Sequence, residues 1–302
     1  MTDDAALIDS LVTRISAINP LQAQFLSDSL AGVEAAERDD LAVYIAYGLA
    51  EGLSIDYLAG CYDLIVKDTL REQMYFQRHK RYRHASFEEV AQSVYFDDEY
   101  MRKYMHGLAI TGYLWPNHRE LHRFFAANIP TDRGGRYLEI GPGHGMYMMT
   151  AMRHSGYSEF HGIDLSPTSV AMTRDLLGSG RFGDFRNCHI FEQDFLAGDI
   201  EAASCAAVVM GEVLEHVEQP GLFLERIRDV AADDAFIFIT TPINAPAIDH
   251  IYLFDSFDSI ESLVDAAGLS IRQQLLVPYP GLSVDESMQR LLPINVALVL
   301  GK

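Results

Sequence analysis

Cysteine and basic residues are both scarce in this chain. Only three cysteines occur among its 302 residues, Cys61, Cys188 and Cys205, and no two of them form a CxxC pair. The odd count and the wide spacing argue against a disulfide framework and for mostly buried thiols. Dispersed cysteines in an odd number predict reduced thiols and a cytoplasmic location.

The shortage of positive charge excludes several kinds of partner. The chain has 23 Lys and Arg against 43 Asp and Glu, which gives a formal net charge of −20. Nucleic acids and anionic membranes are bound by clustered Lys and Arg, so we predict no nucleic acid and no membrane as a partner. One basic segment, residues 78–84, is interpreted as a solvated helix end or loop, with a docking site for an anionic substrate as the alternative.

Long apolar runs are absent as well. No run approaches the ~20 apolar residues that a membrane helix requires. Residues 1–6 are acidic and lack the basic start of a secretory signal. With 49% hydrophobic residues, the chain is expected to bury an ordinary globular core in one or two domains.

The hydrophobic pattern changes near residue 125. Over residues 7–15 and 41–49, apolar positions recur at the three- and four-residue spacing of a helix. Ser86 and Glu89 have the spacing of a capping box, which marks a helix start. These patterns predict an N-terminal all-helical cap domain over residues 1–125.

After the breaker-rich residues 128–135, short apolar runs alternate with helical patterns. Seven such runs, separated by helices or loops, predict a doubly wound, mostly parallel, seven-stranded Rossmann-like α/β sheet in a second domain over residues 126–302. The last two strands are expected to form an antiparallel hairpin at one edge. The runs are residues 137–140, 160–165, 189–193, 206–210, 235–240, 269–276 and 295–300.

A glycine-rich turn follows the first of these strands. The strand carries Glu139 and passes directly into Gly141, Gly143 and Gly145. Glycine lets a backbone turn tightly and approach a ligand closely. Asp164 ends the next strand, about 20 residues on, where a carboxylate can accept hydrogen bonds from ribose hydroxyls. The pattern therefore predicts a cofactor that contains a nucleoside.

Two phosphate-binding patterns are missing from the chain. A nicotinamide turn has the spacing GxGxxG, but residue 146 is methionine where the third glycine is required. No GxxxxGK[ST] loop for a triphosphate occurs either. A compact turn after an acidic strand residue suits a ligand that has a positive centre and no pyrophosphate.

Four motifs in sequence order resemble those of class I S-adenosylmethionine-dependent methyltransferases. They occupy residues 139–145, 162–166, 193–195 and 211–217, and the resemblance extends over about residues 120–302. It implies S-adenosylmethionine as the cofactor and the following cofactor-binding residues: Glu139, Gly141, Gly143 and Gly145 for the methionine portion, Asp164 and Leu165 for the ribose, Asp194 and Phe195 for the adenine, and Gly211 and Glu212 for the methionine end.

The residues also allow structural interpretations. Asp164 precedes a Ser-Pro-Thr sequence and could act only as a helix cap, and Asp194 could stabilise an ordinary turn at a strand end. Residues 212–216 read Glu-Val-Leu-Glu-His and could contact the cofactor, supply a base or bind a divalent metal if His250 were close by. Cofactor contact is the favoured interpretation, so we predict no metal.

Methyl transfer from a sulfonium is an in-line displacement that depends on alignment. A hydroxyl or ammonium acceptor also needs a base. Asp249 and His250 are adjacent in the loop after the fifth strand, and a carboxylate that orients an imidazole is a general-base arrangement. We predict His250 as the base, with a structural loop histidine as the alternative.

The aromatic- and methionine-rich helical segment supplies further candidates. Tyr104 is predicted as a catalytic residue, and Met105, Trp115 and His118 as pocket residues, although such stripes are more often core. The helical domain would then act as a lid over the cofactor and is a candidate surface for a homodimer.

These observations predict a methyltransferase acting on a small molecule in specialised metabolism. The alternative keeps the cofactor as the substrate: its aminocarboxypropyl chain would be transferred or cyclised to an azetidine, with release of methylthioadenosine. A non-catalytic binding protein on the same fold is a third reading.

Overall fold

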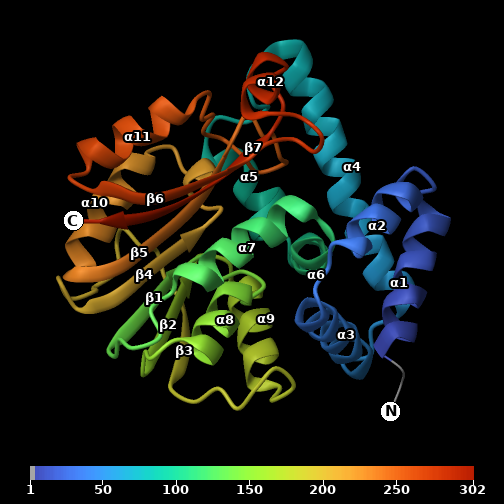
Figure 1. The fold of residues 1–302 in the computed structure, drawn as a ribbon, viewed down its shortest axis with the longest axis horizontal. Helices are drawn as coiled ribbons and strands as arrows, with labels where there is room; N and C mark the ends of the chain where they lie inside the picture. The colour runs from blue at the N-terminus through green and yellow to red at the C-terminus, as the bar shows by residue number, and fades with distance from the viewer. Residues whose placement is uncertain (1–3) are drawn as a thin grey trace.

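The computed structural model describes residues 4–302 as a helical region beside a seven-stranded sheet (Figure 1). Residues 1–3, the start of the acidic segment considered above, lie outside the described residues. The helical region contains α1 (Asp4–Ile18), α2 (Gln22–Ala31), α3 (Ala35–Ala50), α4 (Ile55–His79), α5 (Phe87–Val90), a π-helical turn (Ala91–Tyr95), α6 (Asp98–Leu114) and α7 (Pro116–Asn128).

Side-chain caps mark the starts of two long helices. Ser54 accepts a hydrogen bond from the Tyr57 amide at 3.1 Å and begins α4, and Asp97 begins α6 in the same way through Tyr100. The helix start predicted at Ser86 is confirmed, because Ser86 is the N-cap of α5, but its side chain makes no cap bond among the described residues, so the expected capping box does not form. The Phe87 amide at that helix start donates instead to Glu218, a residue far along the chain.

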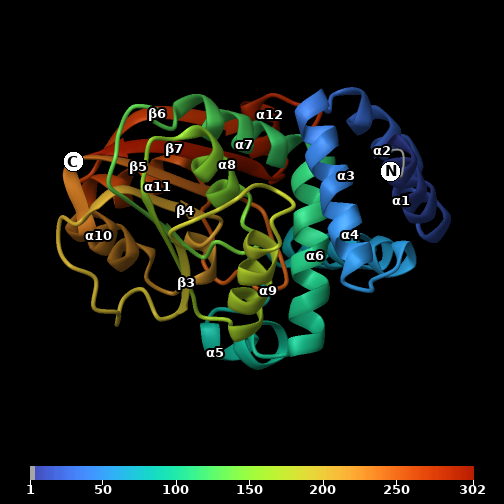
Figure 2. The same cartoon turned by 90° about the horizontal axis from the view of Figure 1, so that it is seen from below.

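Buried α6 connects the helical region with the sheet region. It packs against α4 on one side and against α9 (Pro167–Gly178) on the other, as Figure 2 shows. Its contact with α4 is close at Gly107, where an added Cβ would lie 2.5 Å from the Cys61 carbonyl oxygen. Only glycine allows the two helices to approach to this distance.

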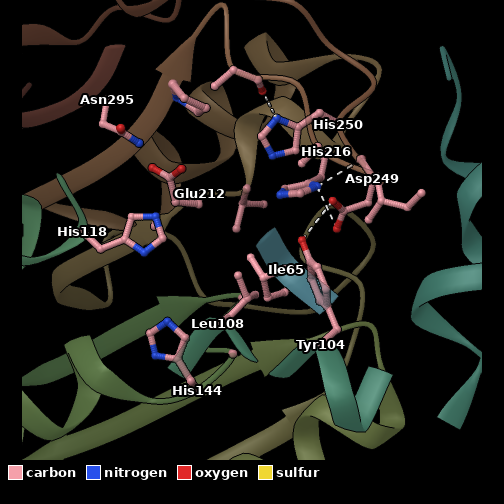
Figure 3. A pocket seen from close by; sticks show the side chains of 18 of the residues that line it. Ile65, Tyr104, Leu108, His118, His144, Glu212, His216, Asp249, His250 and Asn295 are labelled. Atoms are coloured by element: carbon pink, nitrogen blue, oxygen red, sulfur yellow. Dashed lines mark hydrogen bonds and ion pairs between the residues drawn. The ribbon is translucent and has the colours of Figure 1, made fainter. Parts of the chain in front are cut away.

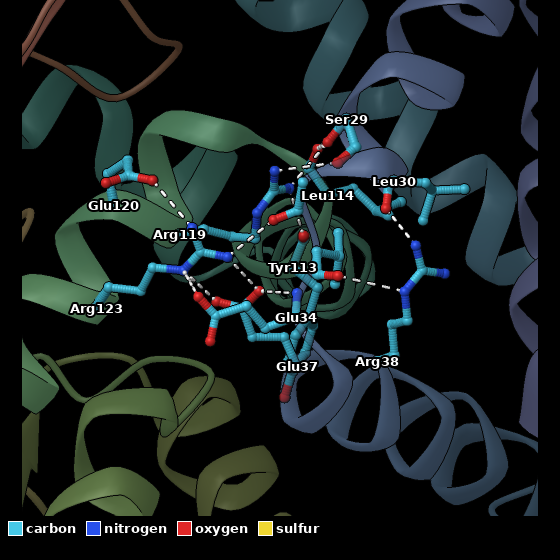
Figure 4. Close-up of polar contacts among 12 residues, drawn as sticks. Ser29, Leu30, Glu34, Glu37, Arg38, Tyr113, Leu114, Arg119, Glu120 and Arg123 are labelled. Carbon is cyan, nitrogen blue, oxygen red and sulfur yellow. Dashed lines mark hydrogen bonds and ion pairs between the residues drawn. The ribbon is translucent and has the colours of Figure 1, made fainter.

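A buried arginine fixes the start of α7. The guanidinium of Arg119 donates to the Tyr113 carbonyl at 2.9 Å and to the Ser29 side chain at 2.9 Å, which ties α7 to α2 and to the end of α6 (Figure 4). One turn further, Arg123 pairs with Glu37 of α3 at 2.7 Å. Because α7 also packs on β6 and β7, these bonds set its direction across the sheet.

The sheet has the strand order β3-β2-β1-β4-β5-β7-β6. All strands are parallel except β7, which runs antiparallel between β5 and β6. The predicted doubly wound sheet and its antiparallel final pair are therefore confirmed. The strands are β1 (Arg136–Ile140), β2 (Glu159–Asp164), β3 (Cys188–Glu192), β4 (Cys205–Gly211), β5 (Ala231–Ile243), β6 (Ser270–Val277) and β7 (Ile294–Gly301).

Alternate residues of each strand enter two separate cores. On β1, Tyr137 packs with α8 (Met146–His154) and the helical region, whereas Leu138 faces the opposite core with α10 (Pro220–Val230) and α11 (Phe257–Ala266). The first core continues without interruption from α1 through α7 to one face of the sheet. The helical region extends to Asn128, and its division from the sheet as a separate domain at residue 125 stays a prediction.

Two further features bear on the sequence patterns, one against them and one in agreement. A short helix, α12 (Val284–Gln289), lies where only a loop between the last two strands is expected, and Ser283 and Glu286 form its capping box. The basic residues 78–84 lie at the end of α4, where Arg83 pairs with Glu72 at 2.9 Å, so the helix-end interpretation is the one that the structure supports. No helix among residues 4–302 combines the length and apolar character that crossing a membrane requires.

The close approach at Gly107 gives a testable prediction. Gly107→Ala should lower the free energy of unfolding by about 1–3 kcal/mol, because its methyl group would overlap the α4 backbone. Gly60→Ala in α4 is the matched control: nothing lies within 4 Å of its added Cβ. That variant should be unchanged or more stable by up to about 1 kcal/mol in urea denaturation. Equal stability of the two variants would contradict the close packing.

Candidate active site

A cavity of about 880 Å³ lies between the carboxyl ends of the parallel strands and the helical region. Its floor includes Gly141, Asp164 and Gly211, which follow or end β1, β2 and β4, and Tyr104 and Leu108 of α6 line the opposite wall. Ligands collect at this edge of an open parallel sheet because the strand order reverses there. Residues from both halves of the chain therefore form one pocket.

The glycine turn has a backbone that requires glycine. Gly141, Gly143 and Gly145 have φ angles of 63°, 50° and 74°, in the left-handed region that other residues rarely adopt. An added Cβ at Gly141 would also lie 2.8 Å from the Val213 side chain. Gly141 and Gly143 line the cavity, whereas Gly145 lies outside it at the start of α8.

Glu139 does not reach the cavity. Its carboxyl is buried on the side of β1 that faces the first core, and it accepts a hydrogen bond from the Tyr137 hydroxyl at 2.6 Å. Burial raises the pKa of Glu139 to about 8, and the Tyr137 bond only partly offsets this. Glu139 is thus mainly protonated near neutral pH. It supports the glycine turn from the side of β1 that faces the first core.

The buried Glu139 predicts a pH-dependent stability. Since its folded pKa lies above the ordinary value, its contribution is complete below about pH 4.5 and is lost as pH rises to about 8, on the order of 4 kcal/mol in all. Glu139→Gln keeps an acceptor for Tyr137 but cannot ionise. Urea denaturation between pH 5 and 8.5 should therefore show a shallower loss of stability in the variant. Parallel profiles for the two proteins would contradict a neutral, buried Glu139.

The second and third predicted cofactor motifs meet in the cavity. Asp164, Leu165, Asp194 and Phe195 all line it. Asp164 accepts hydrogen bonds from the Ser166 amide at 2.9 Å and the Ser169 hydroxyl at 2.8 Å, so it also stabilises the start of α9. Asp194 accepts a bond from the Leu196 amide at 2.8 Å, as the structural interpretation of that residue expects. Each carboxylate keeps lone pairs for a ligand.

Glu212 has an unusual position beyond the end of β4. Its φ of 51° is left-handed, and its amide donates to the Thr240 hydroxyl at 3.0 Å. Its Oε1 is buried without a hydrogen-bond partner among residues 4–302. Figure 3 shows the Glu212 side chain pointing into the cavity near His118 and Asn295. Buried polar atoms are nearly always paired, so an unpaired oxygen here is available to a ligand.

The expected pairing of Asp249 with His250 is wrong. Asp249 is buried and accepts hydrogen bonds from Tyr95 at 3.0 Å and from Tyr104 at 3.1 Å, and its Oδ2 lies 3.4 Å from Nδ1 of His216 (Figure 3). His250 turns away and donates from Nδ1 to the Ala245 carbonyl at 2.6 Å. Adjacent side chains of an irregular loop need not share a side, so neighbours in sequence are separated in space.

His216 and His250 nevertheless meet. Their ring centroids are 4.7 Å apart, and each places Nε2 close to Oε1 of Glu215, at 3.8 Å and 3.9 Å respectively. Glu215 is fully buried; the Thr241 hydroxyl donates to its Oε2 at 2.9 Å, and its Oε1 has no partner in the described part of the chain. Burial first, and then the charge of Glu212, raise the pKa of Glu215.

Several cavity residues carried no usable signal in the sequence. Tyr95 lies in a π-helical turn and is distant in sequence from its hydrogen-bond partner Asp249. Asn295 reaches the cavity from β7. His144 was visible inside the glycine motif, and it lines the cavity with His118 and His122. Burial lowers the pKa of these three histidines to about 3, 4 and 4 respectively, so all three are neutral near pH 7. The expected pocket residues Met105 and Trp115 line the cavity too.

Comparison with known proteins agrees with this geometry. Residues 101–274 match a sequence family described as "Methyltransferase domain". No curated protein matches. The fold is similar to that of mitomycin 7-O-methyltransferase MmcR, with 12% identity over 82% of this chain and 70% of that chain and a TM-score of 0.55.

Two other solved structures share the fold. Phosphoethanolamine N-methyltransferase 2 of Haemonchus contortus, in complex with phosphomonomethylethanolamine and S-adenosylhomocysteine, is 15% identical over 72% of this chain and 60% of that chain, with a TM-score of 0.53. The [4+2]-cyclase SpnF is 15% identical over 61% of this chain and 80% of that chain, with a TM-score of 0.51. Identities this low establish similarity of fold only.

Proposed function

The chain belongs to the methyltransferase-domain family of S-adenosylmethionine-dependent enzymes, and we propose that it methylates a small molecule bound in the cavity between sheet and helices. The observation that carries this proposal is the continuity of that cavity. It joins the glycine turn and Asp164 at one end with Asp249, Tyr104 and His250 at the other. One pocket thus has a place for both cofactor and acceptor.

The residues present fit S-adenosylmethionine. Gly141 and Gly143 leave space that a Cβ would occupy, which suits close approach of the methionine portion, and Glu212 offers an unpaired oxygen near that end. We assign the ribose to Asp164 and Leu165, and the adenine to Asp194 and Phe195. When bound, the cofactor supplies an electrophilic methyl group on a sulfonium.

At the other end, Asp249 and Tyr104 would position the acceptor. Their hydroxyl–carboxylate bond of 3.1 Å connects α6 to the loop after β5, so the acceptor would bind where helices and sheet meet. His250 has its proton on Nδ1 and a free lone pair on Nε2. In the metal-free protein that lone pair is suited to receive a hydrogen bond from a hydroxyl or amino group, although burial lowers the pKa of His250 to about 3 and makes it a weak base.

The size of the cavity and the charge of the protein favour a small acceptor. A volume of about 880 Å³ lies within the range of small-molecule pockets, and helices cover it. A net charge of −20 opposes binding to nucleic acid. We further propose a role in specialised metabolism and a cytoplasmic location, where the three free cysteines would stay reduced. The helical region is proposed as a separate cap domain that can mediate a homodimer.

One observation favours the alternative reaction, in which the cofactor is consumed. Ile65, Met101, Tyr104 and Met105 form a compact apolar and aromatic cluster beside the cavity. Such a surface would pack against the aminocarboxypropyl chain and the sulfonium. Cyclisation of that chain would release methylthioadenosine, whereas methyl transfer releases S-adenosylhomocysteine.

The ribose assignment predicts a binding defect. Asp164→Ala should weaken S-adenosylhomocysteine binding about 10- to 100-fold in calorimetry, because bonds to a charged acceptor contribute about 1.5–3 kcal/mol. Ser169→Ala is the control, since it removes the 2.8 Å structural bond to Asp164 but keeps the carboxylate. It should bind within a few-fold of wild type. Equal affinity of Asp164→Ala and wild type would remove Asp164 from the cofactor site.

The products distinguish the two reactions. We expect purified protein incubated with S-adenosylmethionine and a panel of small hydroxyl and amino acceptors to form S-adenosylhomocysteine and a methylated acceptor, detected by mass spectrometry. With the cofactor alone, no methylthioadenosine should appear above a heat-treated control. Enzyme-dependent methylthioadenosine in the absence of any acceptor would overturn methyl transfer and establish the alternative.

A further inference from the structure

We propose that Glu215, His216 and His250 bind a divalent transition-metal ion at the acceptor end of the cavity. One donor atom from each residue lies within 4.8 Å of the others. The sequence patterns alone favoured no metal, so the convergence of His250 with the 212–216 segment is what the fold adds. Metal binding itself does not depend on the proposed function, but a role for the ion toward the acceptor rests on it.

Both imidazoles present a free lone pair to the same point. The Nδ1 atom of His250 donates to the Ala245 carbonyl, and Nδ1 of His216 lies 3.1 Å from the Asp249 carbonyl. A carbonyl oxygen can only accept a hydrogen bond, and the Tyr95 hydroxyl, 3.0 Å from Nδ1 of His216, donates its own proton to Asp249, so both imidazole protons are on Nδ1. The two Nε2 atoms are therefore unprotonated, and both face Glu215.

Without an ion, the third donor has no partner. Oε1 of Glu215 is 3.8 Å and 3.9 Å from the two Nε2 atoms, which is too long for a hydrogen bond even if the carboxyl carries a proton. The residue is fully buried, and its Oε1 has no hydrogen-bond partner among the described residues. Ligand atoms about 2.0–2.2 Å from an ion stand roughly 3.4 Å apart, so a contraction of this triangle, whose sides are all within 4.8 Å, would complete a site.

The three ligands are held by the surrounding structure. The Glu215 carbonyl accepts hydrogen bonds from the amides of Ile251 and Tyr252 at 2.9 Å and 3.0 Å, which fastens the His250 loop to the Glu215 turn. Thr241 fixes the other carboxyl oxygen of Glu215, and Asp249 lies behind His216. A carboxylate behind a histidine is the arrangement that orients metal-bound imidazoles.

The donor set defines the class of ion. Two imidazole nitrogens and one carboxylate oxygen suit zinc, iron, cobalt, nickel or manganese, whereas magnesium and calcium prefer oxygen ligands alone. Three protein ligands leave a coordination position open. His216 and His250 line the cavity, so an oxygen or nitrogen of the acceptor could occupy that position.

Cobalt is the probe, because its visible absorption reports coordination by the protein. Full-length protein treated with a chelator should bind one equivalent of Co²⁺. Its absorption bands should lie at about 500–650 nm, as is typical of a four- or five-coordinate site. Zn²⁺ should displace it and Mg²⁺ should not. Glu215→Gln and His250→Gln should each weaken Co²⁺ binding at least ~10-fold. His118→Gln, another cavity histidine outside the triad, should bind Co²⁺ as wild type does.

Folding and cofactor binding are measured on the same samples. Circular dichroism establishes whether each variant is folded. If a ligand variant does not fold, Asp249→Asn takes its place in the test: it leaves all three ligands in place and should weaken Co²⁺ binding by about 10-fold. Calorimetry with S-adenosylhomocysteine on metal-free protein tests the cofactor site separately. No stoichiometric Co²⁺ binding by wild type, or binding that none of these variants weakens, would overturn the metal site and leave the methyltransferase proposal intact.

Discussion

The arrangement of the cavity depends on the contacts that the Asp249 carboxylate makes. It is buried, and it collects hydrogen bonds from Tyr95 and Tyr104 of the helical region while it lies against His216 at the end of β4. A buried carboxylate is expensive unless donors surround it, so losing one partner would leave the others unpaired. The helices are therefore held against the sheet at the place where an acceptor would bind.

Most of the histidine side chains that line the cavity around Asp249 are uncharged. Burial keeps His118, His122, His144 and His250 neutral, and it favours the protonated form of Glu215. A cationic sulfonium would then be a principal charge in an enclosed space of low dielectric. Such surroundings strengthen each remaining electrostatic contact, including those of Glu212 and Asp164. A metal ion at Glu215 would add a second positive centre on the opposite side.

The sequence was informative where the chemistry is local. Apolar runs located the strands, and the left-handed turn from Gly141 to Gly145 was readable because only glycine tolerates it. The capping-box spacing of Ser283 and Glu286 marks the start of α12 in the sequence as well. The prolines on either side of this segment indicate a loop instead, and the pattern therefore does not predict the helix. The partners of Asp249 could not be predicted in this way. Tyr95 is 154 positions away from it, and its contact exists only because the helical region packs against the sheet region.

The same limit applies to His250. Sequence adjacency suggested that Asp249 would orient it, but backbone direction in the loop decides which side chains meet, and it brings His250 to His216 and Glu215 instead. The motif residues 212–216 therefore contribute to two places at once, with Glu212 in the wall near the predicted cofactor site and Glu215 in the buried triad.

The central claim is that one cavity holds cofactor and acceptor face to face. A crystal structure of the protein with S-adenosylhomocysteine tests it most directly. We expect the ribose hydroxyls on Asp164, the homocysteine chain along Gly141 and Gly143, and the sulfur facing across the cavity toward Tyr104 and His250. A cofactor product bound outside this cavity, or with its sulfur turned away from these residues, would contradict the account.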